Sequence, residues 1–354
     1  MKRHLARLAI LLLAPAAGAL AAVPASAALP DAFGFVLWSS GSVNPGGTFP
    51  AATTVTLGPA GQFKIMFAGL GGSGGVVHVT AINDAPHWCQ ATNWFQSGVD
   101  EQVKIACFKA TAGGPVPDYT TFSATFERSS PPIAPIAGRF GYVDAQPTGV
   151  LVDQFNSAGL TDIVTPAGTG HWLVQLPGLG NPGAIDGSLQ VTAVSSATTP
   201  VHCKVGKWSP SGTNQIVDVL CFDGVTGALV SSRFTLTYHF AQSLFGASPP
   251  ANFGYLWWAP PLGPLATDFN SVAGPGANSA APGVTGLTAV RFPIVGVVPD
   301  TLQVTAVGGN SNFCGLHGPW VHPPFTTDTV VTVSCYDIAG NRVNTGFTIT
   351  DNSK

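Results

Sequence analysis

The chain has 354 residues, of which only 9% are charged, together with 43 glycines, 30 prolines and six cysteines. Its formal net charge is −3 and it has no basic cluster, which argues against a nucleic-acid partner because such binding rests on Lys and Arg neutralising phosphates. Glutamate occurs only at Glu101 and Glu127, whereas Val, Thr, Phe and Gly are frequent. This composition predicts strands and turns rather than helices.

Residues 1–27 have the pattern of a signal peptide. Lys2, Arg3 and Arg7 precede an apolar run, and Ala25-Ser26-Ala27 fits a cleavage site. No later apolar run approaches the roughly 20 residues that a membrane span needs. We therefore expect a secreted, extracellular protein that has no membrane contact after cleavage and whose cysteines are paired.

Three aromatic-glycine-aromatic triplets begin at Phe33, Phe140 and Phe253, and they indicate a threefold repeat. A Ser-Pro-Pro sequence precedes the second and third triplets, and proline there stiffens a linker and blocks strand pairing. The predicted domains are residues 28–130, 131–247 and 248–354. Each is long enough to bury its own core, so residues 137–245 are expected to fold alone.

The same strands return in each repeat. An alternating strand is predicted at residues 62–67, 171–176 and 288–292, a second at 77–81, 189–193 and 302–306, and a closing strand at 122–125, 234–237 and 347–350. Alternation predicts one buried and one wet face, which places His78 toward solvent. Two such sheets must pack together. The fold class is therefore all-β, with three tandem β-sandwich domains, each stapled by a disulfide, after a cleaved signal peptide.

Each repeat carries one pair of cysteines. The midpoints of the first two pairs fall on Gly98 and Gly212, so a hairpin that turns at either glycine sets its cysteines opposite each other, within reach of a disulfide. The third pair is wider, and Pro323-Pro324 between its cysteines predicts an irregular loop. The predicted disulfides are Cys89–Cys107, Cys203–Cys221 and Cys314–Cys335. No metal site is predicted, because the chain has no C-x-x-C pair and no tight Cys/His cluster.

The cysteine, tryptophan and cysteine-aromatic hairpin, with the Phe-Thr-x-Thr closing strand, resembles repeats of secreted bacterial tandem-repeat β-sandwich proteins of unknown function. The resemblance covers most of the chain after the signal peptide. It implies a secreted, β-rich repeat protein, and it transfers no catalytic residue.

Motifs for chemistry are weak. Gly71 to Gly75 matches G-x-S-x-G but joins two strands, so we interpret it as a turn. Asp153 and Asp268 are expected to cap local loops, and Asp223 and Asp337 to bond the backbone of their own turns. We predict no catalytic residue and no cofactor.

Tryptophans are the best candidates for binding. Trp94, Trp208 and Trp320 lie on the hairpin arms and are expected to pack against a disulfide or the core. Trp38, Trp257 and Trp258 follow the opening triplets and are the candidate binding residues. Trp257 and Trp258 must face opposite ways in a strand, so one of them is expected at the surface or at a domain interface.

Two functions remain open. The first is a secreted non-catalytic binding, adhesion or structural protein, which binds an extracellular polysaccharide or protein surface weakly and through several copies of one site. The alternative is a secreted hydrolase whose site lies between domains and shows no motif.

Overall fold

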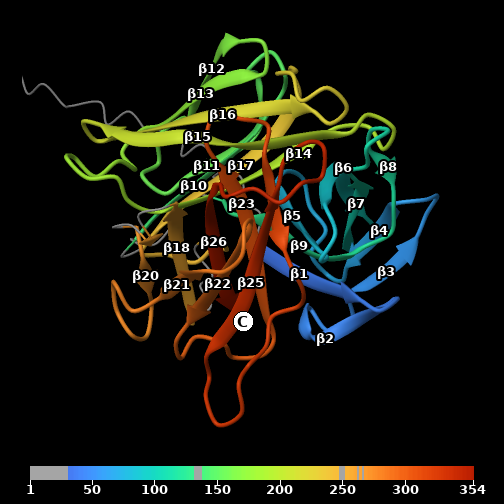
Figure 1. The fold of residues 1–354 in the computed structure, drawn as a ribbon. Coiled ribbons are helices and arrows are strands. Elements are labelled where there is room, and N and C mark those ends of the chain that lie inside the picture. The colour runs from blue at the N-terminus through green and yellow to red at the C-terminus, as the bar shows by residue number, and fades with distance from the viewer. Residues whose placement is uncertain (1–30, 131–137, 247–251, 261–262, 265–266) are drawn as a thin grey trace, which may run out of the picture.

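The computed structural model describes residues 31–130, 138–246, 252–260, 263–264 and 267–354, and every regular element in them is a β-strand (Figure 1). The all-β prediction is confirmed. No helix that could cross a membrane occurs in these ranges. The predicted signal peptide and most of both Ser-Pro-Pro segments lie outside the described residues.

Three sheets make up the molecule. The first has the order β2 (Ser42–Phe49), β1 (Ala32–Ser39), β9 (Thr121–Arg128), β5 (Val76–Ile82), β24 (Phe313–Leu316), β25 (Thr329–Tyr336), β22 (Leu287–Phe292) and β21 (Ser279–Pro282). The second has the order β11 (Leu151–Asn156), β10 (Arg139–Ala145), β17 (Arg233–Phe240), β14 (Ser188–Val194), β6 (His87–Ser97), β7 (Asp100–Lys109), β4 (Gln62–Phe67) and β3 (Thr54–Leu57), with β8 (Val116–Pro117) paired to β7. The third has the order β12 (Ile163–Gly168), β13 (His171–Leu176), β16 (Asn214–Asp223), β15 (Val201–Ser211), β23 (Asp300–Val307), β26 (Gly346–Ser353), β18 (Phe253–Ala259) and β19 (Gly263–Pro264), with β20 (Phe269–Asn270) paired to β18.

Each sheet is shared by two repeats. The hairpin strand of one repeat lies parallel to the second strand of the next, and the order is cyclic: β6 joins β14, β15 joins β23, and β24 joins β5. A single residue pair marks each of these junctions, for example Ala91 with Val194. The third repeat thus returns to the first, and the chain closes into a ring of three units.

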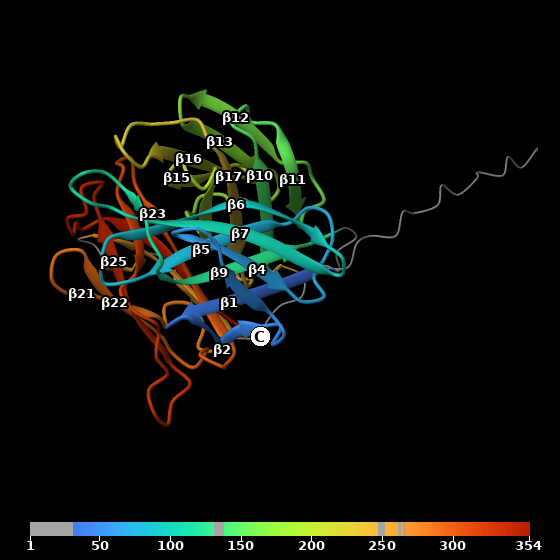
Figure 2. The same ribbon diagram turned by 90° about the vertical axis from the view of Figure 1, so that its right-hand side faces the viewer.

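Every repeat still forms a sandwich of its own. In repeat 1, the half-sheet of β1, β5 and β9 packs against the half-sheet of β4, β6 and β7 around one apolar cluster (Figure 2). Each cluster also takes in a residue from the next repeat: Val194 enters the first, Val307 the second and Ile82 the third. The three cores are therefore separate in composition but joined at their edges.

The predicted disulfides are present in the structure, one in each repeat. Cys89 and Cys107 are directly paired across β6 and β7, with 4.0 Å between their Cα atoms, which is the close spacing of a non-hydrogen-bonded pair. Gly98 and Gly212 have φ values of 67° and 60° at the hairpin turns, as their midpoint positions indicate. The third hairpin has the predicted longer loop between β24 and β25.

The second predicted strand of each repeat is more buried than its alternating pattern predicts. β5, β14 and β23 are buried on both faces, and His78 is only 1% exposed, so its expected place toward solvent was wrong. One face of each strand lines its own sandwich. The other faces the two equivalent strands at the centre of the ring, where the polar side chains meet.

Those side chains form a cyclic hydrogen-bond network, which we call the polar ring. Its donors are three equivalent threonines, and each one donates to the neighbouring repeat. Thr305 donates to Gln190 Oε1 at 2.8 Å, and Thr80 donates to Gln303 Oε1 at 2.9 Å. Thr192 Oγ1 lies 3.2 Å from Nδ1 of His78.

The same hydroxyls accept backbone N–H groups from Val191, Val304 and Val79. Each threonine oxygen therefore receives one hydrogen bond and makes another. This pattern assigns the neutral tautomer of His78 that carries its proton on Nε2, where Thr237 Oγ1 lies at 2.8 Å. Burial and then the nearby His239 lower the pKa of His78 to about 3, so the ring holds an uncharged imidazole.

The sequence predicts that residues 137–245 fold alone. The shared sheets and the polar ring do favour a different outcome from the one expected, because a single repeat would leave its ring groups without partners.

Low pH should lower the stability of the folded protein, because His78 is buried without charge. The unfolded histidine, with a pKa near 6.5, takes up a proton as the pH falls, whereas the buried one does not, so stability is lost below about pH 6.5. His78→Gln, which installs the residue of the other two repeats, should remove that loss. Between pH 7 and pH 5 the free energy of unfolding should fall by about 2 kcal/mol more in the native protein than in the variant.

Thr305→Ala is the matched control, because it breaks the ring without removing a titrating group. It should cost about 1–3 kcal/mol at both pH values, since Gln190 Oε1 and Val191 N–H are left buried and unpaired. Urea unfolding with the disulfides intact measures both variants. An equal acid response in the native protein and in His78→Gln would contradict the assignment.

Candidate functional site

The three candidate tryptophans lie in three different environments. Trp38 is half-buried at the end of β1 and packs against the core of repeat 1. Trp258 is 4% exposed within the core of repeat 3. Trp257 points the other way, as strand alternation requires, and its ring lies 4.4 Å from that of Trp208 in repeat 2. Trp257 is therefore an interface residue, and Trp38 borders a surface groove.

The groove beside Trp38 has a volume of about 350 Å³. It is lined by Trp38, Ser40, Gly41, Leu57, Asn83, Tyr119, Thr120 and Thr121, and none of these carries a charge. Tyr119 is 44% exposed and Leu57 is 57% exposed, so the apolar surface is open to solvent. We call this feature the Trp38 groove. Its volume is within the usual range for small-molecule sites.

The side chains of the groove are held by neighbours. Phe63 lies between the two aromatic walls, with ring centroids 6.2 Å from Trp38 and 5.5 Å from Tyr119. The Tyr119 hydroxyl donates to Gly58 O at 2.6 Å, and Asn83 Nδ2 donates to Thr120 Oγ1 at 3.0 Å. Two fixed rings and a row of hydroxyl and amide groups can therefore be presented with little loss of entropy on binding.

Sequence reasoning found Trp38 but not its partners. Tyr119 is the single tyrosine of the first repeat, and this could have marked it as a candidate. Its exposure, however, depends on how the segment after β8 packs against β4, which the sequence pattern does not show. Asn83 and Leu57 come from two further loops. Only the tertiary structure brings these three segments together.

Within the described residues, neither of the other two repeats has an exposed tryptophan in the place of Trp38. The residues in the place of Trp38 are Ala145, which has no aromatic ring, and Trp258, which is buried. Within the described ranges, the tryptophan lies beside an open groove only in repeat 1. The idea of three equal aromatic sites therefore has no geometric support from these positions.

The aspartates follow their predictions in part. Asp223 accepts bonds from the backbone of Val225 and Thr226, and Asp337 accepts one from Asn341, so both hold their own turns. Asp153 was expected to cap a local loop, but its Oδ2 accepts the backbone N–H of Gly75 in repeat 1 at 2.5 Å. It therefore joins two repeats, and burial raises the pKa of its carboxyl.

Gly71 to Gly75 forms a turn between β4 and β5, as interpreted from the sequence, and no helix follows it as a nucleophile elbow requires.

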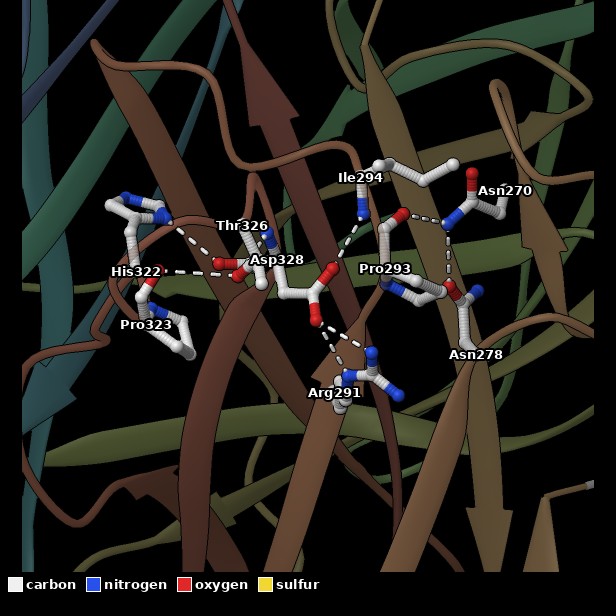
Figure 3. A network of polar contacts seen from close by, with 9 residues as sticks. All are labelled: Asn270, Asn278, Arg291, Pro293, Ile294, His322, Pro323, Thr326 and Asp328. Carbon is white, nitrogen blue, oxygen red and sulfur yellow. Dashed lines mark hydrogen bonds and ion pairs between the residues drawn. The ribbon is translucent and has the colours of Figure 1, made fainter.

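His322, near Trp320, is held by protein groups. His322 Nε2 lies 3.2 Å from Asp300 Oδ2. Its Nδ1 lies 3.2 Å from the backbone oxygen of Asp328 (Figure 3). The hydrogen bond to Asp300 is the main reason why the pKa of His322 is raised to about 9. The Asp328 carboxylate is bound in turn by Arg291 and by the backbone of Ile294. Within the described residues, no group of three His, Cys, Asp or Glu side chains could hold a metal ion.

One buried lysine also has a structural role. Lys204 is 1% exposed, and its Nζ donates to Asn310 O, Asn310 Oδ1 and Asn312 O, each at 3.0 Å. Burial lowers its pKa to about 7. The equivalent Gln90 in repeat 1 likewise bonds a loop of the next repeat, at Ser196 O and Thr199 O. Lys204 therefore ties two repeats together, and its amine is fully engaged.

No family model, no curated protein and no solved structure matches the chain. Function must therefore be argued from the residues and their geometry.

Substitution of the paired tryptophans should separate core from interface. Trp258→Ala should cost about 3–5 kcal/mol of stability, because a nearly buried indole is lost from the core of repeat 3. Trp257→Ala should cost less, because its ring is partly exposed. Urea unfolding measures both. Equal losses, or a larger loss for Trp257→Ala, would contradict these placements.

Proposed function

We propose that this is a secreted, non-catalytic binding protein whose Trp38 groove holds part of an uncharged extracellular polymer, with polysaccharide as the first candidate. The observation that carries the proposal is the lining of the groove: two fixed aromatic rings, several hydroxyl and amide groups, and no charged side chain. Sugar rings offer apolar faces that stack on aromatic rings and hydroxyls that bond to such polar groups.

Two features of the chain support secretion. All six cysteines are paired in disulfides, which form and persist in oxidising compartments. The signal-peptide pattern of residues 1–27 points the same way. The repeats also resemble those of secreted bacterial proteins.

Binding at one such groove would be weak. A groove of this size offers a few stacking and hydrogen-bonding contacts, and association costs several kcal/mol of lost freedom. Because the groove is found in repeat 1 alone among the described positions, strong retention would require several molecules acting on one surface. A protein surface would fit less well, since interfaces are usually larger and flatter than this groove.

The hydrolase alternative needs a free acid and a free base in one pocket. Asp144 and Glu101 line a pocket between repeats 1 and 2. Asp144, however, is held by Arg233, whose Nε and Nη2 donate to its two oxygens at 2.7 and 2.5 Å. Because Asp144 is ion-paired, Glu101 is the one carboxyl left to act in this pocket. An acid and a base are both needed for hydrolysis, so binding is the stronger proposal.

The proposal is tested by retention of the mature protein on insoluble polysaccharides and on cell-wall material. Trp38→Ala and Tyr119→Ala should each weaken retention by about tenfold, since aromatic side chains that become buried on binding contribute most to such contacts. Tyr119→Phe keeps the ring and should bind nearly as the native protein does. Trp257→Ala, away from the groove, is the control.

Folding of each variant is checked by urea unfolding, and Leu57→Ala at the exposed rim provides a further variant that leaves the core intact. Retention that survives both Trp38→Ala and Tyr119→Ala would refute the groove as the binding site. Turnover of any tested polymer would favour the hydrolase.

A further inference from the structure

The three junctions between repeats differ at one equivalent position. After the opening triplets, that position is Leu37, Asp144 or Trp257. Leu37 and Trp257 pack against the preceding repeat around the ring, and Asp144 lines a pocket together with residues of the preceding repeat. Trp257 packs on Trp208. Leu37 belongs to the same apolar cluster as Trp320. These two junctions are therefore filled by large apolar side chains.

The junction between repeats 1 and 2 is charged instead. Asp144 binds Arg233, and the Arg233 guanidinium carbon lies 4.7 Å from the ring centre of Trp94. Asp144 is smaller than Trp257, and its carboxylate is ion-paired with Arg233 of the same repeat. A pocket of about 290 Å³ remains between the two repeats at this place. We call it the junction pocket.

Glycines form one wall of the junction pocket. A side chain at Gly72 would strike the guanidinium of Arg128, and one at Gly74 would strike the carboxylate of Asp153. The wall can therefore approach these charged groups only because it has no side chains of its own. Trp94, Phe95 and Gln96, at the end of the hairpin strand β6, also line the pocket, and the Trp94 indole donates to Gly75 O at 3.2 Å.

Glu101 lines this pocket, and one of its carboxyl oxygens is buried without a partner in the described part of the chain. Its side chain is buried, and its Oε2 accepts the backbone N–H of Gly72 at 3.3 Å. Its Oε1 has no hydrogen-bond partner among the described residues. Burial raises the pKa of Glu101 to about 7. A buried carboxyl oxygen without a partner carries a cost that a bound donor would remove.

We propose that the junction pocket binds a neutral, hydroxyl-rich ligand of the saccharide class, and that Glu101 Oε1 and the Gln96 amide bond its hydroxyls. An anion is disfavoured by the carboxyls of Glu101 and Asp144. A cation is disfavoured because Arg233 covers the Trp94 ring and Arg128 lies against Gly72. Phe95 is 44% exposed at the rim, and Lys104 Nζ lies over its ring, 5.7 Å from the ring centre.

This site is independent of the Trp38 groove. The two share no lining residue, and the junction pocket requires two repeats whereas the groove requires one. A failure at one site would therefore leave the other proposal standing.

The test is a titration of the ¹⁵N-labelled mature protein, followed by NMR. The probes are methyl β-glucoside and cellohexaose as neutral saccharides, with ethylamine hydrochloride and sodium acetate as charged contrasts. A neutral saccharide should shift the Gly72 amide, the Gln96 side-chain amide and the Trp94 indole, with a dissociation constant in the millimolar range. Binding of the monosaccharide would indicate a free sugar, and binding of cellohexaose alone would indicate a polymer.

Variants then assign the contact. Glu101→Ala should weaken saccharide binding by about tenfold, whereas Glu101→Gln keeps an acceptor and should retain most of it. Gln96→Ala is a second variant, at an exposed position where folding is not at risk. Trp38→Ala should leave the titration unchanged.

Three results would overturn the proposal. These are no shift at Gly72 or Trp94 with either saccharide, equal binding by the native protein and both Glu101→Ala and Gln96→Ala, and binding of a charged probe alone.

Discussion

The polar ring at the centre of the molecule is the constraint on which the rest of the structure depends. Each threonine of the ring bonds an acceptor on a neighbouring repeat and receives an N–H from that repeat as well. No repeat can satisfy its own group. Apolar burial supplies most of the free energy of folding but has no direction, whereas an unpaired buried polar group is costly. The ring therefore fixes how the three repeats meet.

Local pattern was enough to predict the strands, the hairpins and the disulfides. The midpoint of Cys89 and Cys107 at Gly98 is enough to define the pairing register of β6 and β7, because the two strands of a hairpin are close together in the sequence. The burial of His78 could not be read in this way, since alternation describes two faces but not what covers them. A weak signal existed: this inner position carries His or Gln in all three repeats, and never Lys or Glu.

Of the residues that line the Trp38 groove, only Trp38 could be predicted from the sequence. Trp38 follows the opening triplet and could be singled out, but Tyr119 and Asn83 arrive from loops whose meeting is set by tertiary packing. The repeats are alike in their core strands and differ at their edges, where Leu37, Asp144 and Trp257 replace one another. The ring thus allows repeat 1 to keep the Trp38 groove. It also allows the junction between repeats 1 and 2 to keep a pocket, while large apolar side chains fill the other two junctions.

The most direct test of this account is the isolated second repeat. Residues 137–245, produced alone in an oxidising compartment, should form the Cys203–Cys221 disulfide but show poorly dispersed amide signals and no cooperative urea transition. The reason is that Gln190 loses Thr305 and Trp208 loses Trp257. The full mature chain is the reference. A well-dispersed spectrum with a cooperative transition in the fragment would contradict the claim that the three repeats stabilise one another through the ring.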